Sequence, residues 1–262
     1  MKIYADNAAT TRVSDTALAA MTPCFQEIYG NPSSLHTPGQ RAAEKLAAAR
    51  AIFARNLHAD PREITFTSGG SEADNQALRT AAALGEKRGK RHIVSTKFEH
   101  HAVLHPMQKL ERQGFSVTYL QPDAEGRVSL EALQAALRPD TILVSIMMVN
   151  NESGAVMPIE RMARLTHRVC PNALFHTDAV QGFFKVPFRA RTLGADLISA
   201  SAHKVHGIKG AGALYIRPGL SLPPFVLGGG QESGLRSGTE GLPAIAAFAA
   251  ACRAALPKRT ES

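Results

Sequence analysis

Short apolar runs alternate with longer amphipathic stretches along most of the chain, from residue 63 onward. Runs rich in β-branched and aromatic residues predict strands at 64–67, 92–96, 116–120, 142–149, 173–177, 196–200 and 211–216. Helical spacing of apolar residues predicts helices at 71–84, 101–112, 130–137 and 159–169. Strands that alternate with helices predict an α/β fold, in which helices cover both faces of a largely parallel sheet.

The run 142–149 is apolar at almost every position. A strand with one face in water alternates apolar and polar residues, whereas an unbroken apolar strand is buried on both faces. We therefore expect this strand in the interior of the sheet.

The two ends of the chain are less regular. A loop rich in Pro, Asn, Ser and Gly is predicted at 30–39, and an Ala-rich helix follows at 40–57. A second Ala-rich helix is predicted to begin at Gly241 and to stop at Pro257, because proline cannot donate a backbone hydrogen bond.

Composition and charge exclude several classes of protein. With 44% hydrophobic residues, the chain can bury a sizeable core in one large domain. The net charge is +8, but Lys and Arg are scattered over helical stretches without a basic stripe, so no nucleic-acid partner is predicted. The three cysteines lack metal-ligand spacing, which predicts no metal site and favours a reducing compartment. Without a signal peptide or a long apolar run, we expect a cytoplasmic protein with no membrane contact.

Polar clusters with chemical potential follow several predicted strands. Lys204 ends the sequence Ser-Ala-His-Lys after the strand 196–200. A lysine at such a position forms a Schiff base when its ammonium is destabilised; the alternative is a solvated loop lysine. Asp178 follows the strand 173–177. It can pair with a pyridinium nitrogen, or it can simply cap the next helix.

Two further kinds of polar cluster also follow predicted strands. Backbone amides of Gly70 and Ser71 precede a predicted helix and could hold a phosphate, although Ser71 could be an ordinary helix cap. His100 and Asn151 each follow a strand; the histidine could stack on a flat ring, or both could be polar loop residues. All the clusters lie at carboxyl ends of strands, where open α/β sheets bind ligands.

These motifs occur in order with Asp-Asn-Ala-Ala-Thr-Thr at 6–11, Gly-Asn-Pro-Ser-Ser at 30–34 and the Gly-rich segment 228–239. Together they resemble cysteine desulfurases of the iron–sulfur-cluster assembly type, within the class V aminotransferase superfamily. The resemblance implies a three-layer α/β/α sandwich, the large domain of pyridoxal-phosphate fold type I. It assigns residues 1–14 to a small domain that is otherwise largely absent, 15–240 to the cofactor-binding domain, and 241–262 to a helix leading to the small domain.

The resemblance also implies pyridoxal 5'-phosphate as the cofactor, with Lys204 as its Schiff-base lysine and His100 as the second catalytic residue, stacked on the ring. Asp178 would pair with the pyridine nitrogen and Gln181 with the ring hydroxyl, while Asn151 lies beside cofactor and substrate. The implied phosphate ligands are Gly70, Ser71, Ser201 and His203. Thr239 would reach the phosphate of the neighbouring subunit in a homodimer.

The implied reaction converts L-cysteine to L-alanine and passes the sulfur through a protein cysteine to an iron–sulfur scaffold or another acceptor protein. In the family, that cysteine and a substrate-binding arginine come from a further third of the chain. Cys24, Cys170 and Cys252 match no such Ser/Gly-rich loop and are expected to be buried thiols. The alternatives are a non-catalytic remnant that binds cofactor or dimerises, and a selenocysteine lyase or other class V lyase.

Overall fold

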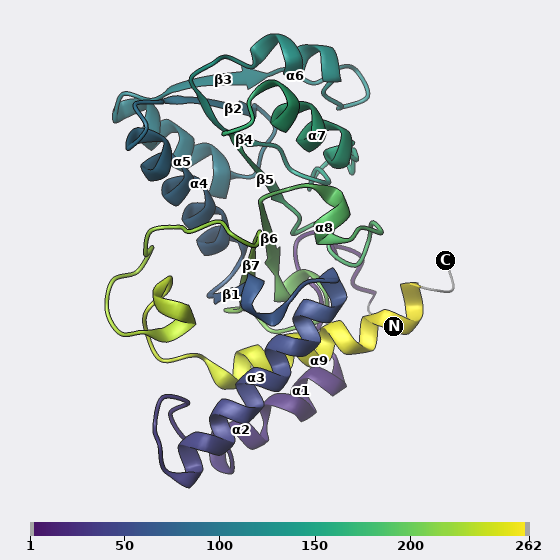
Figure 1. The fold of residues 1–262 in the computed structure, drawn as a ribbon. Helices are drawn as coiled ribbons and strands as arrows, with labels where there is room; N and C mark the ends of the chain where they lie inside the picture. Colours follow the sequence, from purple (N-terminus) through teal and green to yellow (C-terminus); the bar gives the residue numbers. More distant parts are fainter. Residues whose placement is uncertain (1–2, 260–262) are drawn as a thin grey trace.

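The computed structural model describes residues 3–259 and is built around one seven-stranded sheet (Figure 1). The strand order is β1-β7-β6-β5-β4-β2-β3. The strands are Ile64–Thr67 (β1), His92–Thr96 (β2), Ser116–Leu120 (β3), Thr141–Ser145 (β4), Leu174–Asp178 (β5), Leu197–Ser201 (β6) and Gly212–Ile216 (β7). Each predicted strand is present, and the expected α/β fold with a mixed sheet is confirmed.

Helices form a layer on each side of the sheet (Figure 1). One core cluster joins the sheet to α4 and α5, and a second joins it to α3, α6, α7, α8 and α9. The helices are Asp15–Met21 (α1), Pro23–Gln26 (α2), Thr37–Leu57 (α3), Gly70–Glu86 (α4), His101–Arg112 (α5), Leu130–Ala136 (α6), Ile159–Val169 (α7), Ala190–Leu193 (α8) and Leu242–Arg259 (α9). The three-layer α/β/α architecture is therefore confirmed.

The direction of the strands places the polar clusters at one edge. β7 is antiparallel to both of its neighbours, β1 and β6, whereas the pairs β6–β5, β5–β4, β4–β2 and β2–β3 are parallel. All strands except β7 therefore point the same way. Their carboxyl ends meet at the same edge, where the chain continues into the predicted ligand-binding segments.

The apolar run 142–149 lies in the interior of the sheet as expected, but its strand is shorter than predicted. β4 ends at Ser145, although the Met148 N–H still donates to the Asp178 carbonyl at 2.9 Å. Ile146 and Met148 remain buried in the core, while Met147 and Val149 line a cavity. The run is apolar because it is buried around that cavity, and burial does not require continued strand pairing.

The helices differ from the sequence-based expectation in three ways. Helices α1, α2 and α8 were not predicted, because elements of 7, 4 and 4 residues are too short for a helical repeat to be visible. Helix α3 begins earlier than expected, at Thr37, because His36 caps it by accepting from the Gly39 N–H.

The expectation that the last helix stops at Pro257 is wrong, because α9 continues to Arg259. Its earlier turns pack against α1 and α3, which holds the helix direction. Residues 260–262 of the expected tail, and residues 1–2 of the N-terminal segment, lie outside the described residues.

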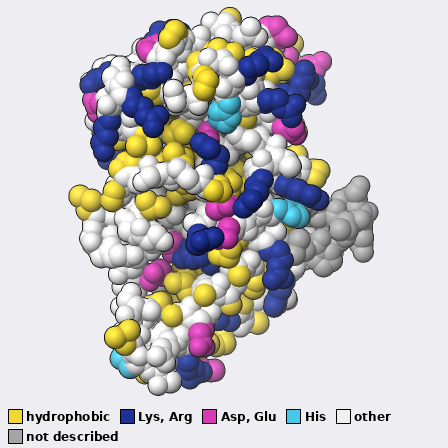
Figure 2. Space-filling model, viewed as in Figure 1, with side chains coloured by type: hydrophobic (Ala, Val, Ile, Leu, Met, Phe, Trp, Pro, Cys, Tyr) yellow, Lys and Arg dark blue, Asp and Glu magenta, His cyan; other side chains and the backbone are white. Residues whose placement is uncertain are grey.

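The described residues carry charges of both signs on their surface. Figure 2 shows Lys and Arg side chains spread over the visible face, with acidic side chains among them. Within residues 3–259, none of the helices combines the length and hydropathy needed to cross a membrane. No cluster of three or more potential metal ligands occurs among these same residues.

The free edge of β1 is closed by a buried ion pair. Arg50 donates to the Ile64 carbonyl at 2.7 Å and pairs with Glu232 at 2.6 Å. Glu232 in turn accepts from the Phe66 N–H at 2.9 Å. The pair thus takes the place of a neighbouring strand and ties α3 to the segment after β7.

We expect Glu232→Ala to lower the free energy of unfolding by about 3 kcal/mol, because Arg50 and the Phe66 N–H would both lose a buried partner. Urea unfolding measures this change. Glu125→Ala is the control, since the exposed Arg127–Glu125 pair should contribute less than about 1 kcal/mol. Equal losses in both variants would contradict the role given to the buried pair.

Candidate functional site

A cavity of about 480 Å³ lies at the carboxyl-end edge of the sheet. Its wall comes from segments that follow five strands, β1, β2, β4, β5 and β6, and from the N-terminal segment. Nine of the ten predicted site residues line it: Gly70, Ser71, His100, Asn151, Asp178, Gln181, Ser201, His203 and Lys204. Residues far apart in the sequence are thus brought together at one place.

Lys204 ends a single 3-10 turn, Ala202–Lys204, directly after β6. Its ammonium donates to the backbone carbonyl oxygens of Ala8 and Ala9, the latter at 2.7 Å. Burial lowers the pKa of Lys204, and the carboxylates of Asp178 and Asp6 oppose this effect. A lowered pKa raises the fraction of neutral amine, which is the nucleophilic form.

The N-terminal segment is tied to the loop that carries Lys204. The Thr11 N–H donates to the His203 carbonyl at 2.8 Å, and the Thr11 hydroxyl accepts from the His206 N–H at 2.8 Å. The Thr10 hydroxyl also lies 3.1 Å from Nδ1 of His203. These contacts set the position of the Ala8 and Ala9 carbonyls next to Lys204.

The backbone between β1 and α4 lies close to its neighbours at two glycines. A Cβ on Gly70 would lie 2.7 Å from Cγ2 of Val180, and a Cβ on Gly212 would lie 2.5 Å from the carbonyl carbon of Gly69. Gly69 is the N-cap of α4 and no side chain caps the helix, so Ser71 is not an ordinary N-cap. Gly70 and Ser71 line the cavity, and no side chain accepts from the first backbone N–H groups of this helix, as an anion site requires.

Asp178 ends β5 and is buried, with only 5% of its surface exposed. One carboxylate oxygen accepts from the Val180 N–H at 2.8 Å, within a turn and not at the start of a helix. Burial and the neighbouring Asp74 raise the pKa of Asp178 to about 7. A cationic partner in the cavity would lower this pKa again and keep the carboxylate ionised.

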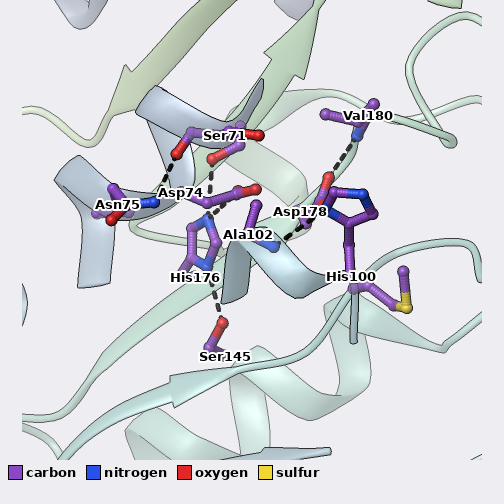
Figure 3. A network of polar contacts seen from close by, with 12 residues as sticks. Ser71, Asp74, Asn75, His100, Ala102, Ser145, His176, Asp178 and Val180 are labelled. Carbon is purple, nitrogen blue, oxygen red and sulfur yellow. Dashed lines mark hydrogen bonds and ion pairs between the residues drawn. The ribbon is translucent and has the colours of Figure 1, made fainter. Parts of the chain in front are cut away.

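His100 is the N-cap of α5 and stands beside Asp178 (Figure 3). Its Nδ1 accepts from the Ala102 N–H at 3.1 Å, so the neutral ring carries its proton on Nε2. Burial lowers the pKa of His100, and the nearby His101 and Lys204 lower it further. The ring is therefore held in a fixed orientation, with an N–H still available for hydrogen bonding.

The amide residues divide into one group at the cavity and one in the supporting loop. Gln181 donates through Nε2 to the Ala8 carbonyl at 2.8 Å and accepts from the Lys185 ammonium at 2.7 Å. Asn151 lines the cavity. Its neighbour Asn150 instead holds the loop, because its side chain donates to the Phe98 carbonyl and accepts from the Ser153 N–H.

Thr239 is the predicted site residue that does not line this cavity. It lies at a separate cavity of about 210 Å³, together with Thr67 and Arg236. Arg236 is paired with Glu72 in the first turn of α4 at 2.7 Å. The predicted reach of Thr239 to a neighbouring subunit stays a prediction.

Sequence reasoning assigned no role to three buried residues of this site. Asp74 lines the cavity, and His176 lies beneath Asp178 with no surface exposed. Glu99 accepts from the Met147 N–H at 2.9 Å and from Thr96 at 2.8 Å, and burial raises its pKa to about 8. Spacing could have indicated two of them. Asp74 is one helical turn after Gly70, and His176 is two residues before Asp178 on a strand, so each shares a face with a predicted site residue.

The three cysteines lie away from the cavity. Cys24, Cys170 and Cys252 are free thiols in the core, and burial raises the pKa of each. This agrees with the expectation that they are buried, unreactive thiols.

Comparison with known proteins agrees with these features. Residues 3–256 match the family model described as aminotransferase class-V. Cysteine desulfurase 2 of Trichormus variabilis is 46% identical over 253 residues, which are 97% of this chain and 63% of that protein. The chain thus spans less than two thirds of the length of this relative.

Two solved structures extend the similarity to the fold. A NifS-like protein matches 100% of this chain and 71% of its own, with a TM-score of 0.97 and 45% identity. A structure described as SspA in complex with cysteine matches 96% of this chain and 72% of its own, with a TM-score of 0.91 and 40% identity.

The close packing of Gly212 against the Gly69 backbone predicts that Gly212→Ala lowers the free energy of unfolding by about 1–3 kcal/mol, since backbone must move to admit a methyl group. Urea unfolding of the ligand-free chain measures the loss. Gly230→Ala is the control, because nothing lies within 4 Å of its added Cβ and its φ is −85°. A Gly212→Ala variant as stable as the control would contradict the packing argument.

Proposed function

The chain belongs to the class-V aminotransferase family, and we propose that its cavity binds pyridoxal 5'-phosphate for the removal of sulfur from L-cysteine. One observation carries the proposal. Lys204, Asp178 and the uncapped start of α4 line the same cavity. They offer the amine, the carboxylate and the anion site that this cofactor requires.

The start of α4 fits the cofactor phosphate. The N–H groups of Gly70 and Ser71 lack a side-chain acceptor, and the helix dipole favours an anion at this end. A Cβ at position 70 would fill part of the space beside Val180, so the glycine keeps the backbone accessible. Ser201 and His203, from the end of β6 and the turn after it, would supply further donors.

Asp178 would supply the carboxylate that pairs with the ring nitrogen of the cofactor. When bound, pyridoxal 5'-phosphate supplies an electron sink for bonds at the substrate α-carbon. Asp178 would hold the proton of the ring nitrogen, and Lys204 would bind the aldehyde carbon through its amine. His100 and Asn151 would flank the ring, and Gln181 would donate to the ring hydroxyl in place of its bond to Ala8.

The same lysine, Lys204, would also transfer protons at the α-carbon of the substrate. Its ammonium is destabilised by burial, so Lys204 can give and take a proton nearer to neutral pH than an exposed lysine can. His100 offers a second group, because its Nε2 is not engaged by the helix cap.

We extend the proposal to the whole protein on the basis of its relatives. The relative from Trichormus variabilis is named a cysteine desulfurase, and one structure similar to this chain is described as a complex with cysteine. We infer that residues 15–240 are the cofactor-binding domain and that the protein acts as a homodimer, to which Thr239 contributes across subunits. Sulfur would pass to an iron–sulfur scaffold or another acceptor protein. The free thiols support a reducing compartment such as the cytoplasm.

We expect the purified chain to bind pyridoxal 5'-phosphate and to give the absorbance band of a lysine-bound cofactor, which Lys204→Ala abolishes. Lys209→Ala is the matched control, because this lysine is exposed in the same loop and does not line the cavity. Absorbance titration with the cofactor measures the effect. The absence of a band in the wild-type chain would refute the cofactor assignment.

We also expect L-cysteine to change this absorbance band, because its amino group competes with Lys204 for the same carbon. The control ligand is 3-mercaptopropionate, which keeps the thiol and carboxylate but lacks the amine. Stopped-flow absorbance measures both reactions. An equal response to the two ligands, or none to cysteine, would contradict the substrate assignment.

A further inference from the structure

A buried polar network lies beneath Asp178 (Figure 3). His176 precedes Asp178 by two residues on β5, so both side chains leave the same face of the sheet. The His176 ring is held between two neighbouring strands, with Nδ1 2.9 Å from the Ser145 hydroxyl and Nε2 3.0 Å from the Ser199 hydroxyl. His176, Ser145 and Ser199 have no exposed surface, so the ring cannot exchange these partners for water.

Asp74 completes the network from the helix above. It lies on α4, is 1% exposed, and also lines the cavity. Its Oδ1 is 3.5 Å from Nε2 of His176 and has no hydrogen-bond partner. A buried carboxylate oxygen without a donor is costly, whereas a protonated one can itself donate.

The groups around Asp74 decide which acid in this region is ionised. Asp178 and Glu99 are carboxyl groups close enough to interact with it, His176 is the neighbouring base, and Lys204 is the nearest cation acting on Asp178. Asp178 accepts the Val180 N–H and faces Lys204, and both favour its anionic form. Asp74 has only the Ser199 hydroxyl to favour its anion. Of the two aspartates, Asp74 therefore keeps its proton more readily.

We propose that Asp74 is a positioning residue that remains protonated beneath the cavity, so that Asp178 is the single aspartate anion facing a cationic ring nitrogen. The part that concerns the ring rests on the proposed function, whereas the proton on Asp74 does not. With a ring cation and one anion, the buried region is neutral. A second anion would leave an uncompensated charge in a low-dielectric environment.

Burial raises the pKa of Asp74 and of Asp178 alike, each to about 7, so the two groups are distinguished by their partners and not by burial. Burial lowers the pKa of His176 to about 4. His176 is therefore neutral at pH 7. If its proton is on Nδ1, facing Ser145, the one lone pair of Nε2 can accept either from protonated Asp74 or from the Ser199 hydroxyl.

The proton on Asp74 makes the stability of the ligand-free chain depend on pH. A carboxyl group with a raised folded-state pKa stabilises the fold fully below its unfolded-state pKa, and this contribution is lost as pH rises through the folded-state value. From about pH 5 to about pH 8, the unfolding constant of the wild-type chain should therefore rise at least about tenfold more than that of Asp74→Asn. Urea unfolding across this pH range measures both.

Gln76→Leu is the control for this comparison. Gln76 is also buried on α4, and neither atom of its amide group has a hydrogen-bond partner, but it does not titrate. The Gln76→Leu substitution should change the free energy of unfolding by the same amount at about pH 5 and at about pH 8. The same pH dependence in Asp74→Asn as in wild type would overturn the proposal. If Asp74→Asn does not fold, carbon NMR of the aspartate-labelled Asp178→Asn chain decides instead, because this variant removes the other aspartate whose pKa is raised to about 7. A carboxyl group still protonated above about pH 6 is expected, and titration of every remaining aspartate below about pH 5 would overturn the proposal.

A second measurement tests the link to the ring. The affinity of the wild-type chain for pyridoxal 5'-phosphate should fall relative to that of Asp74→Asn as pH rises from about 7 to about 9, by up to about tenfold per pH unit, because binding then requires proton uptake by Asp74. A ratio of affinities that does not change with pH would overturn this link. Failure of the wild-type chain to bind the cofactor at any pH would instead refute the proposed function, and the stability comparison would still decide the proton on Asp74.

Discussion

Strand β7 lies between β6 and β1 and runs against both of them, and the site depends on this pairing. Because the two neighbours are each antiparallel to β7, they point in the same direction, and Gly212 of β7 is paired with Thr67 on one side and Ser201 on the other. The glycine lets the Gly69 backbone approach β7 closely. The start of α4 is thereby placed next to the turn that carries Lys204, although more than a hundred residues separate them in the sequence.

The electrostatics of the site follow from this placement. The segments at the strand ends converge with the N-terminal segment on one cavity, so the carboxyl and ammonium groups among them lose water. Desolvation is the largest cause of the shifted pKa of Lys204, Asp178 and His100 alike. It disfavours charge in each group, which moves the pKa of Asp178 upward and that of Lys204 downward, both toward neutral pH, and lowers the pKa of His100, which favours its neutral form. A group that must exchange protons under physiological conditions needs such a shift, and a ligand that restores charge pairing gains from it.

Much of this arrangement could be predicted from the sequence, for physical reasons that also mark its limits. The alternation of strands and helices and the position of nine site residues at strand ends follow from local patterns and from the geometry of parallel sheets. The end of β4 could not be predicted, because Ile146 and Met148 remain buried beyond the last residue of the strand, so the apolar run continues past it. The predicted end of α9 was wrong because Pro257 was taken as the point where the helix stops. Pro106 lies inside α5, so tertiary packing can outweigh the cost of proline in this fold.

The residues missed by sequence reasoning have a common property. A motif search finds residues that are exposed to a ligand in loops, whereas Asp74 and His176 lie within a helix and a strand that look like ordinary core elements. Their positions on the cavity face could be read from helical and strand spacing. Their protonation could not, because it depends on how much water is excluded and on which charges face them across separate elements. Burial raises the pKa of Asp74 and lowers the pKa of His176, so it favours the neutral form of both groups. With both uncharged, as we propose, the neighbouring Asp178 is the group on which a bound cation acts, and only the three-dimensional arrangement assigns it that role.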